Sequence, residues 1–204
     1  MAVWRDHLLP RIVDKACARR DFAEPRRRTL SGLSGDVVEI GFGSGHNLAY
    51  YPSEVDRVLA VEPSAVARRL AEPRAAATGM TIEFIGLDGQ DLPLPDDSAD
   101  AAVSTFTLCT IPDVTRALSE LGRVLRPGGR VHFLEHGLSP DPKVAAWQHR
   151  LTPIQRRVCG GCHFDRSIAQ LITDAGFRIV TLENSYLPGP KTPSYLYQGV
   201  AEAS

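Results

Sequence analysis

The chain has 204 residues, 43% of them hydrophobic, and its 23 basic and 24 acidic side chains give a formal charge of −1. This length supplies one full-sized hydrophobic core and too little for two ordinary ones, so a single domain is predicted. Because the charges balance, no overall positive field holds a polyanion, and nucleic acid is not expected as a partner.

The first 34 residues are predicted to form a helix and a linker that cover part of a substrate site. Apolar residues between 3 and 19 recur close to the helical period, with Pro10 as an interruption. The segment 21–35, which contains proline and glycine, is interpreted as a linker into the core.

Arginines cluster near the start of the chain, and this cluster could contact anionic lipid, tRNA or an acidic substrate. A solvated, arginine-rich linker is the favoured interpretation. Its members are Arg19, Arg20, Arg26, Arg27 and Arg28.

No segment reaches the roughly 18 apolar residues of a membrane-spanning helix, and the charged first residues contain no secretory h-region. Peripheral contact with a membrane stays compatible with the sequence. The four cysteines are few for a chain of this length, which favours a reducing, cytoplasmic location.

From residue 35 onward, short β-branched runs alternate with helical stretches, which predicts an α/β fold with a parallel sheet and right-handed crossovers. Strands are predicted at 36–41, 57–62, 81–86, 99–106 and 130–136. Helices are predicted at 46–51, 64–78, 113–125, 141–157 and 165–175. Two further extended runs, at 177–184 and 194–203, are joined by a loop too short for a crossover helix, so they are predicted to be antiparallel.

A glycine loop follows the first strand and is predicted to open a helix. Gly41, Gly43 and Gly45 allow a tight turn and a close approach of a ligand to the backbone, and a helix N-terminus favours an anionic group. A dinucleotide fingerprint requires glycine where His46 stands, so a nicotinamide oxidoreductase is the less favoured enzyme class.

Polar groups follow the next two strands at the same predicted edge of the sheet. Glu62 ends the second strand, 21 residues past Gly41, where a carboxylate can accept hydrogen bonds from both hydroxyls of a ribose. The acidic segment 88–98 follows the third strand and could contact the edge of an adenine ring.

Four segments are similar to motifs of one enzyme family. VVEIGFGSGHN resembles its first motif, VLAVEPS its second, GLDGQDLPLPDDSAD its adenine loop and LGRVLRPGGRVHFLEH its approach to the fifth strand. In this order, over residues 35–140, they resemble the class I S-adenosylmethionine-dependent methyltransferases. The resemblance implies that 35–204 form a Rossmann-like, three-layer cofactor domain with strand order 3-2-1-4-5-7-6, strand 7 being antiparallel, and S-adenosylhomocysteine as the product.

The resemblance also implies which residues surround the cofactor. Glu39, Gly41 and Gly43 would line its methionine end, Glu62 its ribose, Pro63 and Gln90 the surroundings of its adenine, Asp88 and Gly89 the adenine edge, and Thr105 the methyl donor.

Three further segments resemble the alkyl thiol methyltransferases: STFTLCTIPD, FLEHG and the Gly-Cys-His-x-x-Arg pattern at 161–166. Quinone-biosynthetic and phosphatidylethanolamine methyltransferases share much of this pattern. A small or lipid-like acceptor is therefore implied, with thiols favoured over quinones and quinones over amines. The animal thiol enzymes carry a hydrophobic N-terminal membrane segment that the first residues here do not show, so stable membrane anchoring is not expected.

His136, just past the fifth strand, is the candidate catalytic residue. The sulfonium donor is already activated, so an aligned nucleophile and the exclusion of water supply much of the catalysis. A histidine at this edge can accept a proton from the acceptor near neutral pH; the alternative is a histidine that only bonds to nearby backbone. Glu135 is expected to point away from His136 and to form no more than a salt bridge.

Aromatic and sulfur-containing residues are candidates for the substrate pocket, and core positions are the alternative for each of them. They are Trp4, His7, Phe106, Cys109, Trp147, Cys162 and Tyr186.

The segment CGGCH at 159–163 matches the pattern of covalent haem attachment, which normally requires export. One CxxC pair supplies only two of the four ligands of a structural zinc ion, and the other histidines are scattered along the chain. No metal is therefore expected. The favoured role is a substrate-side loop that caps a helix starting near Asp165, and a dithiol redox pair is the alternative.

A third functional class for the whole chain is a cofactor-binding regulator without catalytic activity, or an RNA-associated module that uses the arginine cluster.

Overall fold

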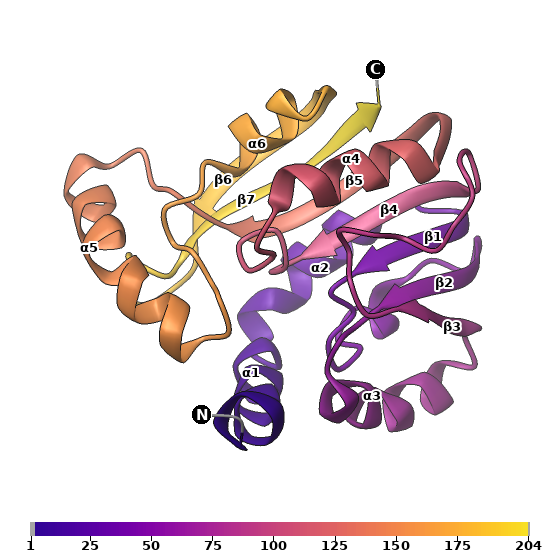
Figure 1. Ribbon diagram of the computed structural model, residues 1–204, viewed down its shortest axis with the longest axis horizontal. Coiled ribbons are helices and arrows are strands. Elements are labelled where there is room, and N and C mark those ends of the chain that lie inside the picture. The colour runs from indigo at the N-terminus through magenta and orange to yellow at the C-terminus, as the bar shows by residue number, and fades with distance from the viewer. Residues whose placement is uncertain (1–2, 204) are drawn as a thin grey trace.

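The computed structural model describes residues 3–203, and its centre is a seven-stranded sheet in the order β3-β2-β1-β4-β5-β7-β6 (Figure 1). Strands β1 to β5 pair in parallel, and β7 runs antiparallel to both β5 and β6. The predicted order and the antiparallel strand 7 are therefore confirmed. The strands are β1 Gly35–Ile40, β2 Val55–Val61, β3 Ile82–Gly86, β4 Ala99–Thr105, β5 Leu125–His136, β6 Phe177–Tyr186 and β7 Tyr195–Ala203.

Helices cover both faces of the sheet. A π-helical turn Trp4–Leu8 precedes α1, and a 3-10 turn Arg20–Phe22 precedes α2. The α-helices are α1 Leu9–Cys17, α2 Ala23–Leu30, α3 Ala65–Thr78, α4 Val114–Val124, α5 Pro142–Val158 and α6 Ile168–Asp174. Among the described residues, none of the helices combines the length and the apolar character needed to span a bilayer.

The alternation of side chains along β1 explains the three layers. Val38 and Ile40 share one buried cluster with residues of α4 and α6, whereas Val37 lies in a second cluster with residues of α2 and α3. Successive side chains of a strand point to opposite faces, so a central strand that is covered on both sides is apolar at nearly every position.

The predicted linker at 21–35 is wrong, because most of it is helical. Pro25 occupies the first turn of α2, where its missing N–H has no helical partner to lose. Leu30 at the end of α2 is fully buried against the sheet, and Arg26 is only 4% exposed. The solvated-linker interpretation therefore fails for Arg26, while Arg19, Arg20 and Arg27 are exposed.

The predicted helix at 46–51 is also wrong, because only one 3-10 turn, Leu48–Tyr50, forms after the glycine loop. Tyr51 is extended, with φ −64° and ψ 134°. Pro52 follows it, and the residue before a proline is disfavoured in the helical region. The glycine loop therefore gains little from a helix dipole.

We predict that β7 tolerates no side chain at Gly199, which lies between β5 and β6. A Cβ there would overlap the carbonyl oxygen of Thr181 and would lie 2.8 Å from Cζ of Phe133. Gly199→Ala should lower the free energy of unfolding by about 1–3 kcal/mol, measured by urea denaturation, because overpacking strains the sheet.

The matched control is Gly122→Ala in α4, where the new Cβ would meet Phe177 at an ordinary 3.6 Å. Alanine is the better helix former, so this variant should be neutral or more stable by up to about 1 kcal/mol. Equal stability of the two variants would contradict the packing at Gly199.

Candidate active site

The carboxyl ends of β1, β2, β4 and β5 meet at one edge of the sheet, where ligands bind in open α/β folds (Figure 1). Helices α1 and α5 lie beside this edge (Figure 1). Trp4, in the π-helical turn before α1, joins this turn to α5, since its indole N–H donates to the carbonyl of Val158 at 3.0 Å. The N-terminal segment thus shares this edge with the predicted cofactor residues.

The glycine loop requires glycine for conformational and steric reasons. Gly41, Gly43 and Gly45 all have positive φ values, of 71°, 59° and 76°. At Gly41 a side chain would also collide with Thr107, which follows β4. The loop therefore packs closely against the end of the neighbouring strand.

Glu62 holds the glycine loop at the end of β2. Its carboxylate accepts hydrogen bonds from the backbone N–H of Gly43 at 2.8 Å and of Ser64 at 2.7 Å. Burial raises the pKa of Glu62, while these two amides favour its charged form.

A buried polar network joins the ends of β1 and β4. The side-chain amide of Asn47 donates to Glu39 at 2.6 Å and to the hydroxyl of Thr105 at 3.0 Å, and Tyr51 donates to Glu39 at 2.8 Å. Arg26 donates to the amide oxygen of Asn47 at 2.6 Å. Burial raises the pKa of Glu39 to about 7 against the effect of these hydrogen bonds.

Sequence reasoning named Glu39 and Thr105 but missed Arg26, Asn47 and Tyr51. Asn47 stands at the end of the first cofactor motif, and that position is the one signal that could have indicated it. Arg26 was hidden in the arginine cluster, since neither periodicity nor charge distinguishes one of its members from the others.

The other predicted adenine-side residues lie in the loop after β3 and at the end of β2. Asp88 is exposed and accepts from the backbone N–H of Gln90 at 2.9 Å, and Gln90 in turn accepts from the N–H of Asp113 at 2.8 Å. Gly89 is buried, and Pro63 is exposed. These contacts hold the loop in place at the sheet edge.

Helix α1 docks on the glycine loop through Asp14. Its carboxylate accepts from the hydroxyl of Ser44 at 2.7 Å and lies 3.0 Å from both Arg74 and His46. The hydrogen bond from Ser44 and the charges of Arg74 and His46 outweigh burial and lower the pKa of Asp14. His46, the position that separates the loop from the dinucleotide pattern, thus contacts the N-terminal helix.

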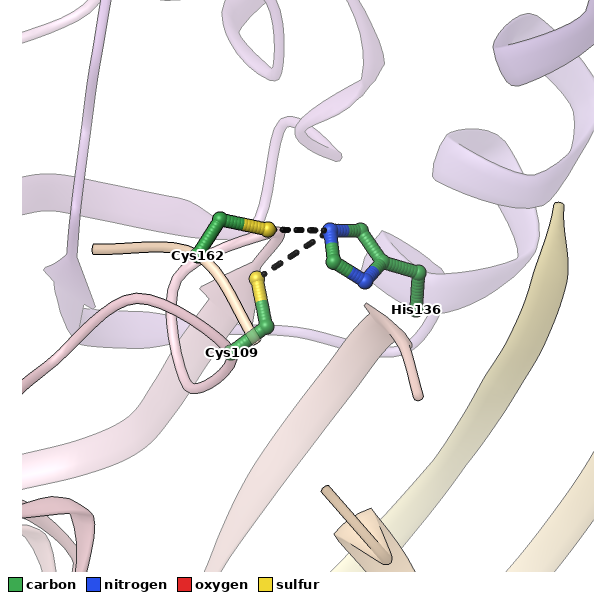
Figure 2. Close-up of side chains that lie close together, drawn as sticks. All are labelled: Cys109, His136 and Cys162. Atoms are coloured by element: carbon green, nitrogen blue, oxygen red, sulfur yellow. Dashed lines mark hydrogen bonds between the residues drawn. The ribbon is translucent and has the colours of Figure 1, made fainter. Parts of the chain in front are cut away.

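One imidazole and two thiols meet where β5 ends (Figure 2). Nε2 of His136 lies 3.1 Å from Sγ of Cys162 and 3.4 Å from Sγ of Cys109. Both cysteines are buried, at 6% and 1% exposure. Nδ1 of His136 is buried too, and it has no hydrogen-bond partner among the residues that the structure describes.

Each member of this cluster comes from one of the three segments that resemble thiol methyltransferases. Cys109 follows β4, His136 ends β5, and Cys162 lies between α5 and α6. Burial opposes the charged form of His136, but contact with Cys162 and the nearby charge of Glu135 raise its pKa. We define these three residues as the Cys-His-Cys cluster.

The expectation that Glu135 forms no more than a salt bridge is wrong. Its buried carboxylate accepts from the hydroxyl of Ser104 at 2.7 Å and from the backbone N–H groups of Thr107 at 2.9 Å, Leu108 at 3.1 Å and Cys109 at 3.4 Å. Among residues 3–203 it forms no ion pair with a basic side chain. It fixes the loop that carries Cys109.

The CGGCH segment lies against the same loop. The N–H of His163 donates to the carbonyl of Cys109 at 2.8 Å, and Arg166 donates to the carbonyls of Leu108 and Ile111. Gly161 has a φ of 99°, and a Cβ added there would lie 3.2 Å from the carbonyl oxygen of Thr110. The Gly-Cys-His-x-x-Arg pattern therefore clamps the loop after β4.

The predicted helix-capping role of this segment is wrong. Helix α6 begins at Ile168 after Ser167, and no side chain caps it. Asp165 instead lies 3.2 Å from Nδ1 of His149. Cys159, the other thiol of the CxxC pair, is partly buried beside Cys109 and Cys162.

The predicted pocket residues do not all come together. Phe106, Cys109 and Cys162 surround His136, and the ring of Phe106 lies 4.9 Å from that of Phe22. Phe106 also has an uncommon positive φ of 56°.

The remaining aromatic candidates have other surroundings. Trp147 is 55% exposed beneath Arg150, and Tyr186 packs against Tyr195 and bonds to Ser139. His7 is exposed, and Trp4 contacts α5 as described above.

Comparison with known proteins shows to which family this chain belongs. A methyltransferase domain family matches residues 38–133. The human thiol S-methyltransferase TMT1B is 32% identical over 165 residues, which cover 78% of this chain and 67% of that protein. The phosphatidylethanolamine N-methyltransferase of Cereibacter sphaeroides is 29% identical over 163 residues, which cover 76% of this chain and 78% of that protein. The chain spans about two thirds of the length of the thiol enzymes that it matches.

Among solved structures, geranyl diphosphate methyltransferase in complex with S-adenosylmethionine has a TM-score of 0.68 at 17% identity, covering 89% of this chain and 84% of that one. A likeness at this identity concerns the fold alone. Sequence similarity and fold together confirm the family resemblance and the cofactor it implies. The chain belongs to the class I S-adenosylmethionine-dependent methyltransferases.

Proposed function

We propose that the protein transfers the methyl group of S-adenosylmethionine to the thiol of a small, rather apolar molecule. The observation that carries this proposal is the Cys-His-Cys cluster at the carboxyl edge, set between the rings of Phe106 and Phe164. The similarity to thiol S-methyltransferases supports it. In addition, the three sequence segments that resemble such enzymes each contribute one member of the cluster.

The cofactor is proposed to lie along the ends of β1, β2 and β4. Glu62 already accepts hydrogen bonds from two backbone amides, and its oxygens retain lone pairs that can accept the hydroxyls of the ribose as further donors. Glu39 and Thr105 surround the methionine end, and the loop containing Asp88 and Gly89 lies beside the adenine. Thr105 would then be the residue beside the methyl donor.

Thiol chemistry suits this arrangement. A thiol like that of cysteine has a pKa of about 8.5, so a single assisting group produces enough thiolate at neutral pH, whereas an amine like that of lysine, with a pKa of about 10.4, needs far more help. The thiolate sulfur attacks the methyl carbon, the bond from that carbon to the sulfonium breaks, and its electron pair remains on the sulfur of S-adenosylhomocysteine. His136 is proposed to assist the loss of the acceptor's proton.

The N-terminal segment is proposed to close the site. Phe22 packs on Phe106. The guanidinium carbon of Arg26 lies 5.9 Å from the ring centre of Phe22 and 5.5 Å from that of Phe106. Such a wall excludes water from the methyl transfer. We also propose a reducing, cytoplasmic location, since the cluster depends on two free thiols.

A second candidate function is methylation of a lipid amine or a quinone. Its support is the relative from Cereibacter sphaeroides, of which the chain covers 78%. The test is a panel assay that follows S-adenosylhomocysteine release with small apolar thiols, quinols, amines and phosphatidylethanolamine. We expect turnover with thiols. Product from a quinol or a lipid amine, with none from thiols, would replace the thiol assignment by the second candidate.

The affinity for S-adenosylhomocysteine should rise with pH below neutrality. The free protein holds Glu39 partly protonated because burial raises its pKa to about 7, whereas the positive amino group of the ligand favours the carboxylate. Binding then releases a proton, so affinity increases as pH rises through the pKa of the free protein. Calorimetry should show a gain of roughly fivefold from pH 6 to pH 7. In Glu39→Gln the affinity should be lower and flat over this range; an unchanged pH dependence would remove Glu39 from the methionine end.

His136→Ala should lower thiol methylation at pH 7 by roughly 10²-fold or more. Part of the loss should return near pH 9, where the acceptor's thiolate forms without assistance. The affinity for S-adenosylhomocysteine should barely change, and thermal unfolding should show that the variant folds. The control is His149→Ala, whose imidazole is exposed and lies beside Asp165. A loss that is the same at both pH values would show that His136 has no part in deprotonation.

A further inference from the structure

We propose that the Cys-His-Cys cluster binds a zinc ion, and that the acceptor's thiolate occupies the fourth position of this ion. The inference rests on the proposed thiol methylation and says how His136 assists it. The imidazole would act as a ligand of the ion that ionises the acceptor.

The geometry of the three ligand atoms suits zinc. Sγ of Cys109, Sγ of Cys162 and Nε2 of His136 all lie within 4.8 Å of one another, and Nε2 faces both sulfurs (Figure 2). Tetrahedral zinc, with bonds of about 2.3 Å to sulfur and about 2.0 Å to nitrogen, holds its ligand atoms about 3.5–3.8 Å apart. The separations of 3.1 and 3.4 Å from Nε2 therefore need to widen by only a few tenths of an ångström.

The donor set indicates both the metal and an open position. Two thiolates and one imidazole favour zinc over the oxygen-seeking ions magnesium and calcium, and two thiolates balance its charge. Three protein ligands with a free fourth position are typical of catalytic zinc, whereas structural zinc has four. The cluster supplies three such residues among those that the structure describes.

The ligands are held before any ion binds. Glu135 fixes the backbone of Cys109, and the N–H of His163 ties the segment of Cys162 to the Cys109 carbonyl. Arg166, which follows Cys162, donates to the carbonyl of Leu108, which precedes Cys109, and so joins the same two segments. A site whose ligands are positioned by their own hydrogen bonds loses little entropy when the metal binds.

This proposal departs from the expectation that no metal binds, which came from counting the CxxC pair. The fold uses only Cys162 from that pair and adds Cys109 and His136, which are 53 and 26 positions earlier in the chain. Cys159 is outside the cluster. The number of ligands thus rises from two to three.

The reaction at this ion balances as follows. The acceptor R–SH binds as the thiolate and releases its proton to solvent, because a metal-bound thiol is deprotonated. The thiolate sulfur attacks the methyl carbon, the carbon–sulfonium bond breaks, and its electron pair stays on S-adenosylhomocysteine. The product R–S–CH3 is a neutral thioether and a weak ligand, so it leaves the zinc. An amine or a quinol gains less from this site than a thiol does.

The first experiment measures zinc in the full chain, purified under reducing conditions and supplied with zinc before desalting. We expect about one ion per chain, with Cys109→Ser and Cys162→Ser each lowering the occupancy by roughly tenfold. Cys159→Ser is the matched control and should keep its zinc. Zinc loss in Cys159→Ser without loss in Cys109→Ser would assign the metal to the CxxC pair and overturn the proposal.

The second experiment uses the unmodified chain, so it does not depend on whether the variants fold. Cobalt(II) in place of zinc should give visible ligand-field bands of a tetrahedral thiolate site, and a small apolar thiol should shift them while the matching alcohol should not. A protein that methylates thiols but takes up neither metal refutes the zinc site and leaves the proposed function intact. A protein that binds zinc, with bands unmoved by thiols and no thiol methylated, refutes thiol binding at the metal and the thiol assignment together.

Discussion

The carboxylate of Glu135 organises the site. It accepts hydrogen bonds from the hydroxyl of Ser104 and from the three consecutive backbone N–H groups of residues 107–109. Those amides follow the last strand residue of β4 and have no sheet partner of their own. Burying a carboxylate is unfavourable unless it is hydrogen-bonded, and here the carboxylate accepts the backbone N–H groups of the turn that follows β4 as its hydrogen-bond donors. This turn places Cys109 beside His136, the neighbour of Glu135 in the chain.

The N-terminal segment is bound to the glycine loop in the same way, through buried or partly buried polar groups. Asp14 binds the glycine loop through Ser44, and Arg26 binds Asn47, which holds Glu39 and Thr105. Charged groups of α1 and α2 are therefore partners of the loop that would receive the methionine end. Their burial without such partners would be unfavourable, so helix docking and site assembly are coupled.

The fold and the chemistry have different origins in this chain. The seven-stranded sheet is shared with methyltransferases of many acceptors, so it positions a cofactor without selecting what is methylated. In the proposed function, the acceptor-side groups come from three loops at the carboxyl edge, one each from the ends of β4 and β5 and from the segment before α6. Glu135, His163 and Arg166 join these loops by hydrogen bonds, so the three loops form one connected unit.

The sequence by itself determined the strands and the glycines at 41 and 43, because β-branched runs and left-handed backbone are local properties. The order of the strands followed from the family motifs. The sequence misjudged α2 and the turn at 48–50, where the positions of Pro25 and Pro52 decided the outcome. Only the tertiary structure brought together side chains 26 and 27 positions apart, as in the Cys-His-Cys cluster. Contacts between separate loops depend on how the sheet orders its strands, and no local pattern encodes that distance.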